Sequence, residues 1–414
     1  MRGVGASEWF PRERYMDKLR ASRDTPFIKV ITGIRRCGKS TLMNMFIREL
    51  LDSGVPEDRI VHIDFDIDFP DTPVDHSELT ALVESQLTPG KDTYLFFDEI
   101  QNVREWEVSV ASFYARKADV YVTGSNSQML SSELATKLSG RCVEIRVSPL
   151  SFSEYRIFRR DSGKGDADLF DDYIHDGSLP AVALLEDSPA RSIIPETLDG
   201  TYSTVFLKDV IGRHDLRNPT MLNNIVRFMM RNIGDRTSAR NTASYMTGAG
   251  LKVSHTTVEG YISYVTEAFL MVRSERIDSK TKEFLLTTDK FYATDLGIRN
   301  RVAGFRVDDI DGILENVVHN ELLYRYGNAA VCVVGRYEVD FVSETADGPA
   351  YFQVSMNIGD ADTRERELRP LMALDNNYPK TIIVYDRFPL RDVDGVRVVG
   401  IVDWLTETDG LRRE

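Results

Sequence analysis

Short apolar runs alternate with stretches of helical periodicity through the first 150 residues of the chain. The segment 40–54 has apolar residues at helical spacing and a glycine at its end, so it predicts a helix. Runs without a polar face are typical of parallel strands that helices bury on both sides. The pattern therefore predicts an α/β fold with a parallel sheet, whose strands are expected at residues 27–33, 59–66, 93–99, 119–127 and 141–151.

Helical periodicity dominates the next part of the chain. Residues 152–205 read as helices joined by loops, and three further helices are expected at 223–234, 237–250 and 254–269. The segment 270–280 reads as strand, turn and strand, which is a small hairpin. Helix, short helix, longer helix and β-hairpin is the order of a winged helix-turn-helix, so a winged-helix-like segment is expected here.

From residue 313 onward the chain returns to mixed helices and strands. A helix at 313–327 precedes three strands, and a helix at 362–374 is followed by another strand at 380–386. This order predicts a small α/β domain with its own core. Because 414 residues are too many for one ordinary domain, we expect three domains, at 1–205, 206–305 and 306–414.

Composition limits the class of protein. The chain is 42% hydrophobic and 28% charged, as soluble globular proteins are, and no run of 18 uncharged apolar residues predicts a membrane span. The N-terminus lacks the apolar segment of a signal peptide. Cys37, Cys142 and Cys332 are too few and too far apart for a disulfide framework or a zinc site. A cytoplasmic location without a membrane partner is therefore expected.

The segment from Gly33 to Ser40 reads GIRRCGKS and fits the pattern G-x-x-x-x-G-K-[ST] at every fixed position. Glycines let main-chain N–H groups converge on phosphate oxygens, and the following helix points its positive end at the same anion. Lys39 is expected to bridge the β- and γ-phosphates of ATP, and the Ser40 hydroxyl to ligate Mg²⁺. The residues expected to bind the nucleotide are Gly33, Arg35, Arg36, Cys37, Gly38, Lys39, Ser40 and Thr41.

Two carboxylates, Asp98 and Glu99, end another predicted strand in the manner of a Walker B motif. Asp98 is expected to hold Mg²⁺ through water, and Glu99 to orient and deprotonate the attacking water. After the next strand, Asn126 is the expected sensor of the γ-phosphate, with Ser125 as the second choice. Arg141 is expected either to act as an arginine finger in a neighbouring subunit or to be a surface or ion-paired arginine.

With these motifs in this order, the chain resembles the AAA-type P-loop ATPases of bacteria and archaea that carry a C-terminal domain similar to PD-(D/E)xK nucleases. The resemblance covers nearly the whole chain and implies an ATPase core, a middle winged-helix segment and a nuclease-like fold at the end. It also implies a homo-oligomeric ring, with a hexamer as the expected size. The stretches that carry it are RERYMDKL, VITGIRRCGKSTLM, YLFFDEIQNV, VTGSNSQML with LSGR, PLSFSEY, ENVVHNELLYRYG, GRYEVDFV and YFQVS.

The nuclease pattern needs a Glu, an Asp and then (Asp/Glu)-x-Lys, so that carboxylates bind a metal and the lysine activates water. Glu315 or Glu321 fits the first position, and Asp340 fits the second. The last pair is Gln353 and Ser355, so one anionic ligand and the lysine are both replaced. We therefore expect a degenerate nuclease fold that persists as a DNA-binding or architectural module.

Charge bears on the DNA hypothesis. The net charge of −14 argues weakly against a general nucleic-acid binder, but residues 205–304 hold fifteen Lys and Arg against ten Asp and Glu. The candidate recognition helix is near 254–268, and the following wing is expected to neutralise phosphates. The residues expected to contact DNA are His255, Thr256, Thr257, Tyr261, Arg273, Arg276, Lys280 and Lys282.

These observations favour an ATP-driven motor or remodeller that acts on duplex or branched DNA. Two alternatives remain, a nucleotide-gated switch that binds protein partners and, less favoured, an ATP-regulated nuclease. DNA-stimulated turnover, a co-purifying protein or Mg²⁺-dependent nicking would separate these three functions.

Overall fold

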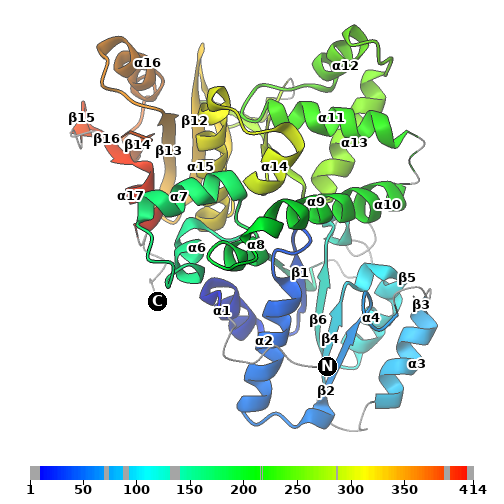
Figure 1. The fold of residues 1–414 in the computed structure, drawn as a ribbon. Coiled ribbons are helices and arrows are strands. Elements are labelled where there is room, and N and C mark those ends of the chain that lie inside the picture. The colour runs from blue at the N-terminus through cyan, green and yellow to red at the C-terminus, as the bar shows by residue number, and fades with distance from the viewer. Residues whose placement is uncertain are drawn as a thin grey trace. The chain divides into compact units, whose positions relative to one another are not determined.

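The chain folds into two compact units in the computed structural model (Figure 1). The first unit comprises Met1–Pro149 with Glu267–Phe269, and the second comprises Leu150–Thr266 with Leu270–Glu414. Among the described residues, no helix combines the length and apolarity needed to cross a membrane. The structure describes residues 10–69, 74–86, 93–130, 140–214, 216, 218–285, 288–386 and 392–407.

The first unit is built on a five-stranded sheet in which every neighbouring pair is parallel. Its strand order is β2-β4-β6-β1-β7, so β6 separates the strand that ends in Asp98 from the strand that leads to Gly33. The predicted parallel sheet is therefore confirmed. Its strands are β1 (Ile28–Thr32), β2 (Ile60–Asp64), β4 (Tyr94–Asp98), β6 (Asp119–Gly124) and β7 (Cys142–Arg146).

Helices pack against this sheet. The helix that follows the glycine-rich loop buries Phe46, whose ring lies 6.4 Å from that of Phe96 and 5.3 Å from that of Tyr121. Because the strands are parallel, their carboxyl ends share one edge, which is where the predicted nucleotide residues follow β1, β4 and β6. The helices are α1 (Glu13–Ser22), α2 (Lys39–Asp52), α3 (His76–Gln86) and α4 (Trp106–Ala115), with a short pair, β3 (Val74–Asp75) and β5 (Val103–Arg104).

The second unit begins with helices. One helical run is continuous from α9 through a π-helix, Val205–Ile211, into α10. The expected domain boundary at 205/206 falls inside this run, and the three-domain division stays a prediction. The helices are α6 (Phe152–Phe158), α7 (Asp166–Asp176), α8 (Pro180–Leu185), α9 (Ile194–Thr204), α10 (Gly212–His214), α11 (Pro219–Arg231), α12 (Ala239–Gly248), α13 (His255–Glu267) and α14 (Leu296–Ala303).

The strands after α13 correct one expectation. Both strands expected within 270–280 exist, as β8 (Met271–Ser274) and β9 (Arg276–Asp278), but they do not form a hairpin with each other. Strand β8 pairs with β10 (Lys290–Ala293), and β9 runs parallel to β11 (Ala330–Val334). The single residue between β8 and β9 is too short to reverse the chain, so the two strands enter different sheets.

A seven-stranded mixed sheet forms the end of the chain, in the order β15-β16-β14-β13-β12-β11-β9. The predicted helix, three strands, helix and strand are all present, whereas β15, β16 and the last helix were not predicted. The remaining elements are α15 (Ile310–Tyr326), β12 (Tyr337–Thr345), β13 (Gly348–Ser355), α16 (Ala361–Met372), β14 (Lys380–Val384), β15 (Asp392–Val393), β16 (Val396–Gly400) and α17 (Ile401–Thr406).

Candidate nucleotide site

The loop between β1 and α2 needs glycine at both of its fixed glycine positions. Gly33 has φ 144°, and a Cβ there would lie 2.1 Å from the carbonyl oxygen of Val147. Gly38 has φ 102° and immediately precedes the first residue of α2. A larger residue would therefore be strained at Gly38 and would clash with the main chain at Gly33.

Arg12 anchors this loop from outside the sequence motif. Its side chain is 3% exposed, and its Nη1 donates to the Cys37 carbonyl at 3.1 Å. The same guanidinium donates to the carbonyls of Ser148 at 2.8 Å and Pro149 at 3.1 Å. The sequence reasoning gave Arg12 no role, because its partners are remote in sequence and are main-chain atoms of unremarkable residues.

The structure brings the loop lysine and the second Walker B carboxylate together. Lys39 is 4% exposed, and its Nζ donates to the carbonyls of Gly33 at 3.0 Å and Ile34 at 3.3 Å. The same Nζ lies 3.6 Å from Glu99 Oε1. Arg35 lies near the second oxygen of the same carboxylate, with its Nη2 3.7 Å from Glu99 Oε2. The two motifs, some sixty residues apart in sequence, thus meet at one edge of the sheet.

These two cations set the charge of Glu99. Burial alone would raise the pKa of this carboxyl, but the Lys39 and Arg35 charges outweigh burial and lower the pKa below its ordinary value. Gln101 Nε2 donates a short hydrogen bond to the same carboxylate. Glu99 is therefore an anion at neutral pH, which is the form that can accept a proton from water.

Asp98 lies beside Glu99 and is 1% exposed. Thr123, the penultimate residue of β6, donates a short hydrogen bond from Oγ1 to Asp98 Oδ1 and accepts one from the Glu99 main-chain N–H at 2.9 Å. Thr123 thereby fixes both acids. The sequence alone does not identify this role, because within its apolar strand Thr123 resembles an ordinary β-branched residue.

The turn after β6 contains a buried side chain, Asn126, that has a hydrogen-bond donor left over among the described residues. Asn126 is 0% exposed, and its Oδ1 accepts from the Gln128 main-chain N–H at 2.7 Å. Its Nδ2 has no hydrogen-bond partner in the part of the chain that the structure describes. A buried amide donor without a partner costs about 1–3 kcal/mol, so Nδ2 is suited to a ligand oxygen. Ser125 is also buried and accepts from Gln101 Nε2 at 3.3 Å.

The remaining loop residues divide by burial. Burial raises the pKa of the Cys37 thiol, so Cys37 is a neutral filler inside the loop rather than a reactive thiolate. Ser40 is half-buried in the first turn of α2, while Arg36 and Thr41 are exposed. The Ser40 hydroxyl and the Asp98 carboxylate are oxygen donors of the kind that Mg²⁺ uses together with phosphates and water, so the donor set fits this ion.

Arg141 lies at the other edge of the sheet. It immediately precedes β7, whose first residue, Cys142, is in register with Ile28 at the start of β1. The length of β1, about 15 Å at ~3.3 Å per residue, therefore separates Arg141 from the loop of its own chain. Its guanidinium is 5.5 Å from the Tyr114 ring centroid. Leu138 and Ser139 of the LSGR motif lie outside the described residues.

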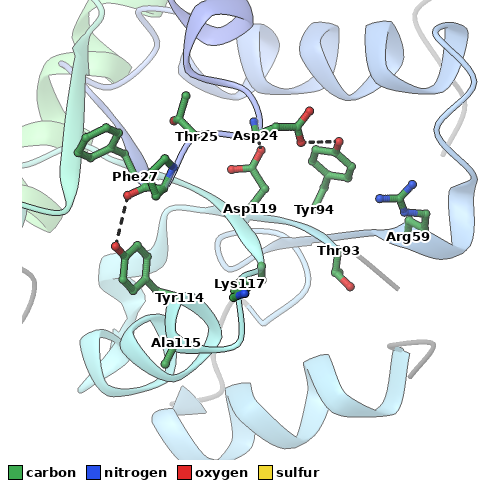
Figure 2. Close-up of a pocket in the computed structure, with 12 residues that line it drawn as sticks. Asp24, Thr25, Phe27, Arg59, Thr93, Tyr94, Tyr114, Ala115, Lys117 and Asp119 are labelled. Carbon is green, nitrogen blue, oxygen red and sulfur yellow. Dashed lines mark hydrogen bonds between the residues drawn. The ribbon is translucent and has the colours of Figure 1, made fainter. Parts of the chain in front are cut away.

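A cavity of about 690 Å³ also opens at this amino-terminal edge (Figure 2). Its walls include Phe27, Arg59, Tyr94 and Lys117, and Tyr94 donates from its hydroxyl to Asp24 at 2.7 Å. The cavity lies across the sheet from the glycine-rich loop. It therefore takes no part in the phosphate site.

A second buried lysine lies in the C-terminal region of the second unit. Lys290 of β10 is 5% exposed, and its Nζ lies 3.0 Å from Glu315 Oε2. Two acids of β12 are also close to this Nζ, Glu338 at 3.6 Å and Asp340 at 3.7 Å. Burial alone would lower the pKa of Lys290, but these carboxylates raise it, with Glu315 having the largest effect. Lys290 is thus held as a cation.

The candidate residues of the nuclease pattern lie on α15, β12 and β13. Glu315, rather than Glu321, faces Asp340, because Glu321 Oε1 accepts from Arg325 at 2.7 Å inside the core. Gln353 donates to Glu367 at 3.0 Å. Among the residues that the structure describes, no group of three or more His, Cys, Asp and Glu side chains is arranged to hold a metal ion.

Two of the residues expected to contact DNA are in the wrong environment. Tyr261 is 8% exposed, and Arg276 is 7% exposed with its Nε 3.1 Å from Glu338 Oε2. The expected exposure of Tyr261 is wrong, because Tyr261 faces the core side of α13. Arg276 does not suit the phosphate contact expected of it, because it is buried in a sheet strand and paired with Glu338. Arg273 is paired with Asp289. The residues that are exposed as expected are His255, Thr256, Thr257, Lys280 and Lys282.

Two protein families match parts of this chain. The family described as AAA domain matches residues 25–156, which span the sheet of the first unit. A domain of unknown function (DUF8612) matches residues 167–309. The solved structure of the Walker-type ATPase PABY2304 of Pyrococcus abyssi has a TM-score of 0.53 at 15% identity, covering 73% of this chain and 98% of that one. This similarity supports the fold.

Two relatives match over most of the chain. An uncharacterized protein of Methanocaldococcus jannaschii is 29% identical over 361 residues, 83% of this chain and 77% of its own. An uncharacterized protein of Haemophilus influenzae is 31% identical over 400 residues, 96% of this chain and 98% of its own. The chain therefore belongs to the family of the Haemophilus influenzae protein, and its first unit is an AAA-type P-loop ATPase domain.

Proposed function

We propose that the chain binds ATP with Mg²⁺ and hydrolyses it at the edge formed by β1, β4 and β6. The meeting of the Lys39 ammonium with the ionised Glu99 carboxylate, 3.6 Å apart, carries this proposal. Both groups are buried, and they follow β1 and β4, which end at the same edge of the sheet with β6 between them. A polyphosphate that enters the loop replaces Glu99 and the two carbonyls as partners of the lysine.

Each residue then has one task. The loop amides and Lys39 bind the β- and γ-phosphates, while Ser40 and Asp98 hold Mg²⁺, which neutralises charge on the phosphates. Glu99 accepts a proton from the water that attacks the γ-phosphorus, and the bond from that phosphorus to the ADP oxygen breaks. Asn126 Nδ2 donates to the γ-phosphate or to that water. Thr123 keeps Asp98 and Glu99 in place.

The proposed assembly is a homo-oligomeric ring in which Arg141 acts on the nucleotide of the neighbouring subunit. The position of Arg141, exposed and far from its own loop, supports a role between subunits. Mixing Arg141→Ala protein with Lys39→Ala protein should restore part of the ATPase activity that each lacks alone. If the mixture is no more active than its components, Arg141 acts only within its own chain.

The proposed substrate of this motor is DNA. The support is the order of α11, α12, α13 and the antiparallel β8–β10 pair, together with the excess of Lys and Arg in residues 205–304. The nuclease alternative has less support, because Gln353 and Ser355 replace two required groups and Lys290 already neutralises the remaining acids.

The test is the rate of phosphate release with and without single-stranded, duplex and four-way DNA. We expect one of these DNAs to raise the rate several-fold, and Glu99→Gln protein to show no rate that DNA can raise. Unchanged turnover with every DNA, together with a partner protein that co-purifies, would instead favour the nucleotide-gated switch.

A further inference from the structure

A pocket between α11 and α12 in the second unit carries the features of a nucleotide-binding groove. Its volume is about 420 Å³, and its walls include Asn224, Arg227, Arg231, Tyr245 and Arg306. Figure 1 shows the two helices beside each other. None of these residues belongs to the ATPase site, and none was singled out by the sequence reasoning.

Three arginines give the pocket its charge. In the described part of the chain, Arg227, Arg231 and Arg306 form no ion pair, and all three are exposed. The one acid in the pocket wall, Asp309, is engaged by the buried Arg299 at 2.7 Å. The pocket therefore carries unbalanced positive charge, which favours an anion.

Two of these arginines are held in fixed orientations. Arg227 Nε donates to the Val302 carbonyl at 3.2 Å, and Arg231 Nε donates to the Ala303 carbonyl at 3.4 Å. Both carbonyls belong to the last turn of α14, so the two guanidinium planes are tied to one helix end. A guanidinium fixed through Nε keeps its terminal N–H groups for a phosphate, which accepts from them in pairs.

An aromatic platform adjoins the arginines. Tyr245 is 56% exposed, and its ring centroid lies 4.4 Å from that of Phe228 in the pocket wall. An exposed ring held against a second ring is a surface on which an unpaired base stacks. Asn224 and Asn232 add amide groups that can hydrogen-bond a base edge.

We infer that this pocket binds one unpaired nucleotide of a DNA strand, with phosphates on Arg227 and Arg231 and the base on Tyr245. The inference rests on the proposed DNA-dependent function and names the surface that binds the DNA. It moves the DNA contact from the α13 face and wing, where Tyr261 and Arg276 are buried, to the α11–α12 groove. The same chemistry suits a free nucleotide, so the experiment includes that source.

The experiment measures binding of the full-length chain to a labelled oligo-dT by fluorescence anisotropy. Arg227→Glu with Arg231→Glu should weaken binding about 10-fold to 100-fold. The plot of log affinity against log salt concentration should become less steep, by about one phosphate contact for each arginine. Arg306→Glu, at an exposed position whose side chain makes no hydrogen bond in the described chain, should weaken oligo-dT binding less and replaces the double variant if that one does not fold. Arg160→Glu, elsewhere in the same unit, is the matched control and should bind as the parent does.

Tyr245→Ala tests the stacking half of the inference. It should weaken oligo-dT binding about 10-fold while leaving binding of an abasic strand of equal charge unchanged. Excess thymidine monophosphate that competes as well as oligo-dT would assign the pocket to a free nucleotide and overturn the inference. Normal binding by the Arg227/Arg231 variant would also overturn it, while DNA-stimulated ATPase in that variant would leave the proposed function standing. If the parent chain binds no DNA, the DNA-dependent function itself fails.

Discussion

Lys39 in the first unit and Lys290 in the second are both buried lysines that face acidic side chains, and they differ in what surrounds the ammonium group. Lys39 donates to two main-chain carbonyls, and its ammonium nitrogen lies 3.6 Å from one carboxylate, that of Glu99. Lys290 has three carboxylates within 3.7 Å. The first lysine can exchange its partners for a phosphate, whereas the second is already neutralised by acids of its own chain.

The difference shows how similar ingredients give a binding site in one place and a structural centre in another. A divalent metal binds a carboxylate cluster because the cluster lacks a cation. The Lys290 ammonium already supplies positive charge among Glu315, Glu338 and Asp340, and two arginines, Arg236 and Arg276, add to it at Glu338. The acids near Lys290 therefore stabilise the fold and do not form a ligand-binding site.

Lys39→Ala should have the largest effect, because it removes the cation proposed to bind both terminal phosphates. We expect ATP affinity to fall at least about 100-fold and turnover to become undetectable, while the free energy of unfolding changes little. Isothermal titration calorimetry measures the affinity. Arg48→Ala, on the exposed side of the same helix, is the control, and near-normal affinity in Lys39→Ala would overturn the assignment of the loop.

Glu99→Gln should separate binding from chemistry. The amide keeps the shape of the side chain but cannot accept the proton, so we expect ATP to bind while kcat falls about 100-fold to 1,000-fold. Loss of the anion also removes the acid that lies 3.6 Å from the Lys39 ammonium, so ATP affinity should rise rather than fall. An unchanged single-turnover rate would remove Glu99 from the role of base.

Lys290→Met should affect stability where Lys39→Ala does not. Removing the cation leaves the half-buried Glu315 and the buried Asp340 without the ammonium group that they share, at a cost of about 3–5 kcal/mol to the free energy of unfolding. Urea denaturation followed by circular dichroism measures this change. Lys164→Met removes a half-exposed pair with Asp172 and should cost under about 1 kcal/mol. Equal stability of the two variants would show that the Lys290 cluster is not a structural centre.

Asp340→Asn should give the smallest effect, visible as a change in pH dependence. Burial and the Glu315 charge raise the pKa of Asp340 to about 8, against an ordinary value of 3.8. A carboxyl with a raised pKa stabilises the fold while it is protonated, so its contribution is complete below about pH 4 and is lost as the pH rises through 8.

The free energy of unfolding of the parent chain, from urea denaturation at each pH, should therefore fall between pH 6 and pH 9, and that of the Asn variant should fall less, by about 1 kcal/mol. The amide oxygen of the variant can still accept from the Val354 main-chain N–H, as Asp340 does at 2.9 Å. Parallel curves for the two proteins would mean that Asp340 does not titrate in this range.

Local pattern predicted what local sequence determines. The strands of the first sheet, the helix from Lys39 and the two glycines of the loop all have short-range signals, namely apolar runs, helical spacing and the G-x-x-x-x-G-K-[ST] pattern, and both glycines have positive φ. The C-terminal strands and helices up to β14 were also predicted. Periodicity therefore located elements well even where their pairing was unknown.

Pairing between distant segments could not be predicted in the same way. The strands β9 and β11 are separated by some fifty residues, and nothing in either segment specifies the other. Lys290 meets Asp340, and Thr123 meets Asp98, only because the sheets place them together. A single sequence contains no record of such long-range contacts, so Lys290 and Thr123 were missed.

Arg12 joins two parts of the first unit that have different duties. Its guanidinium contacts the Cys37 carbonyl within the phosphate loop and the carbonyls of Ser148 and Pro149, after which the chain passes into the second unit. Any displacement of the loop that accompanies cleavage of ATP pulls on the same side chain that holds this exit. Under the proposed function, Arg12 is therefore a direct mechanical connection between the phosphate loop and the point where the chain leaves the first unit.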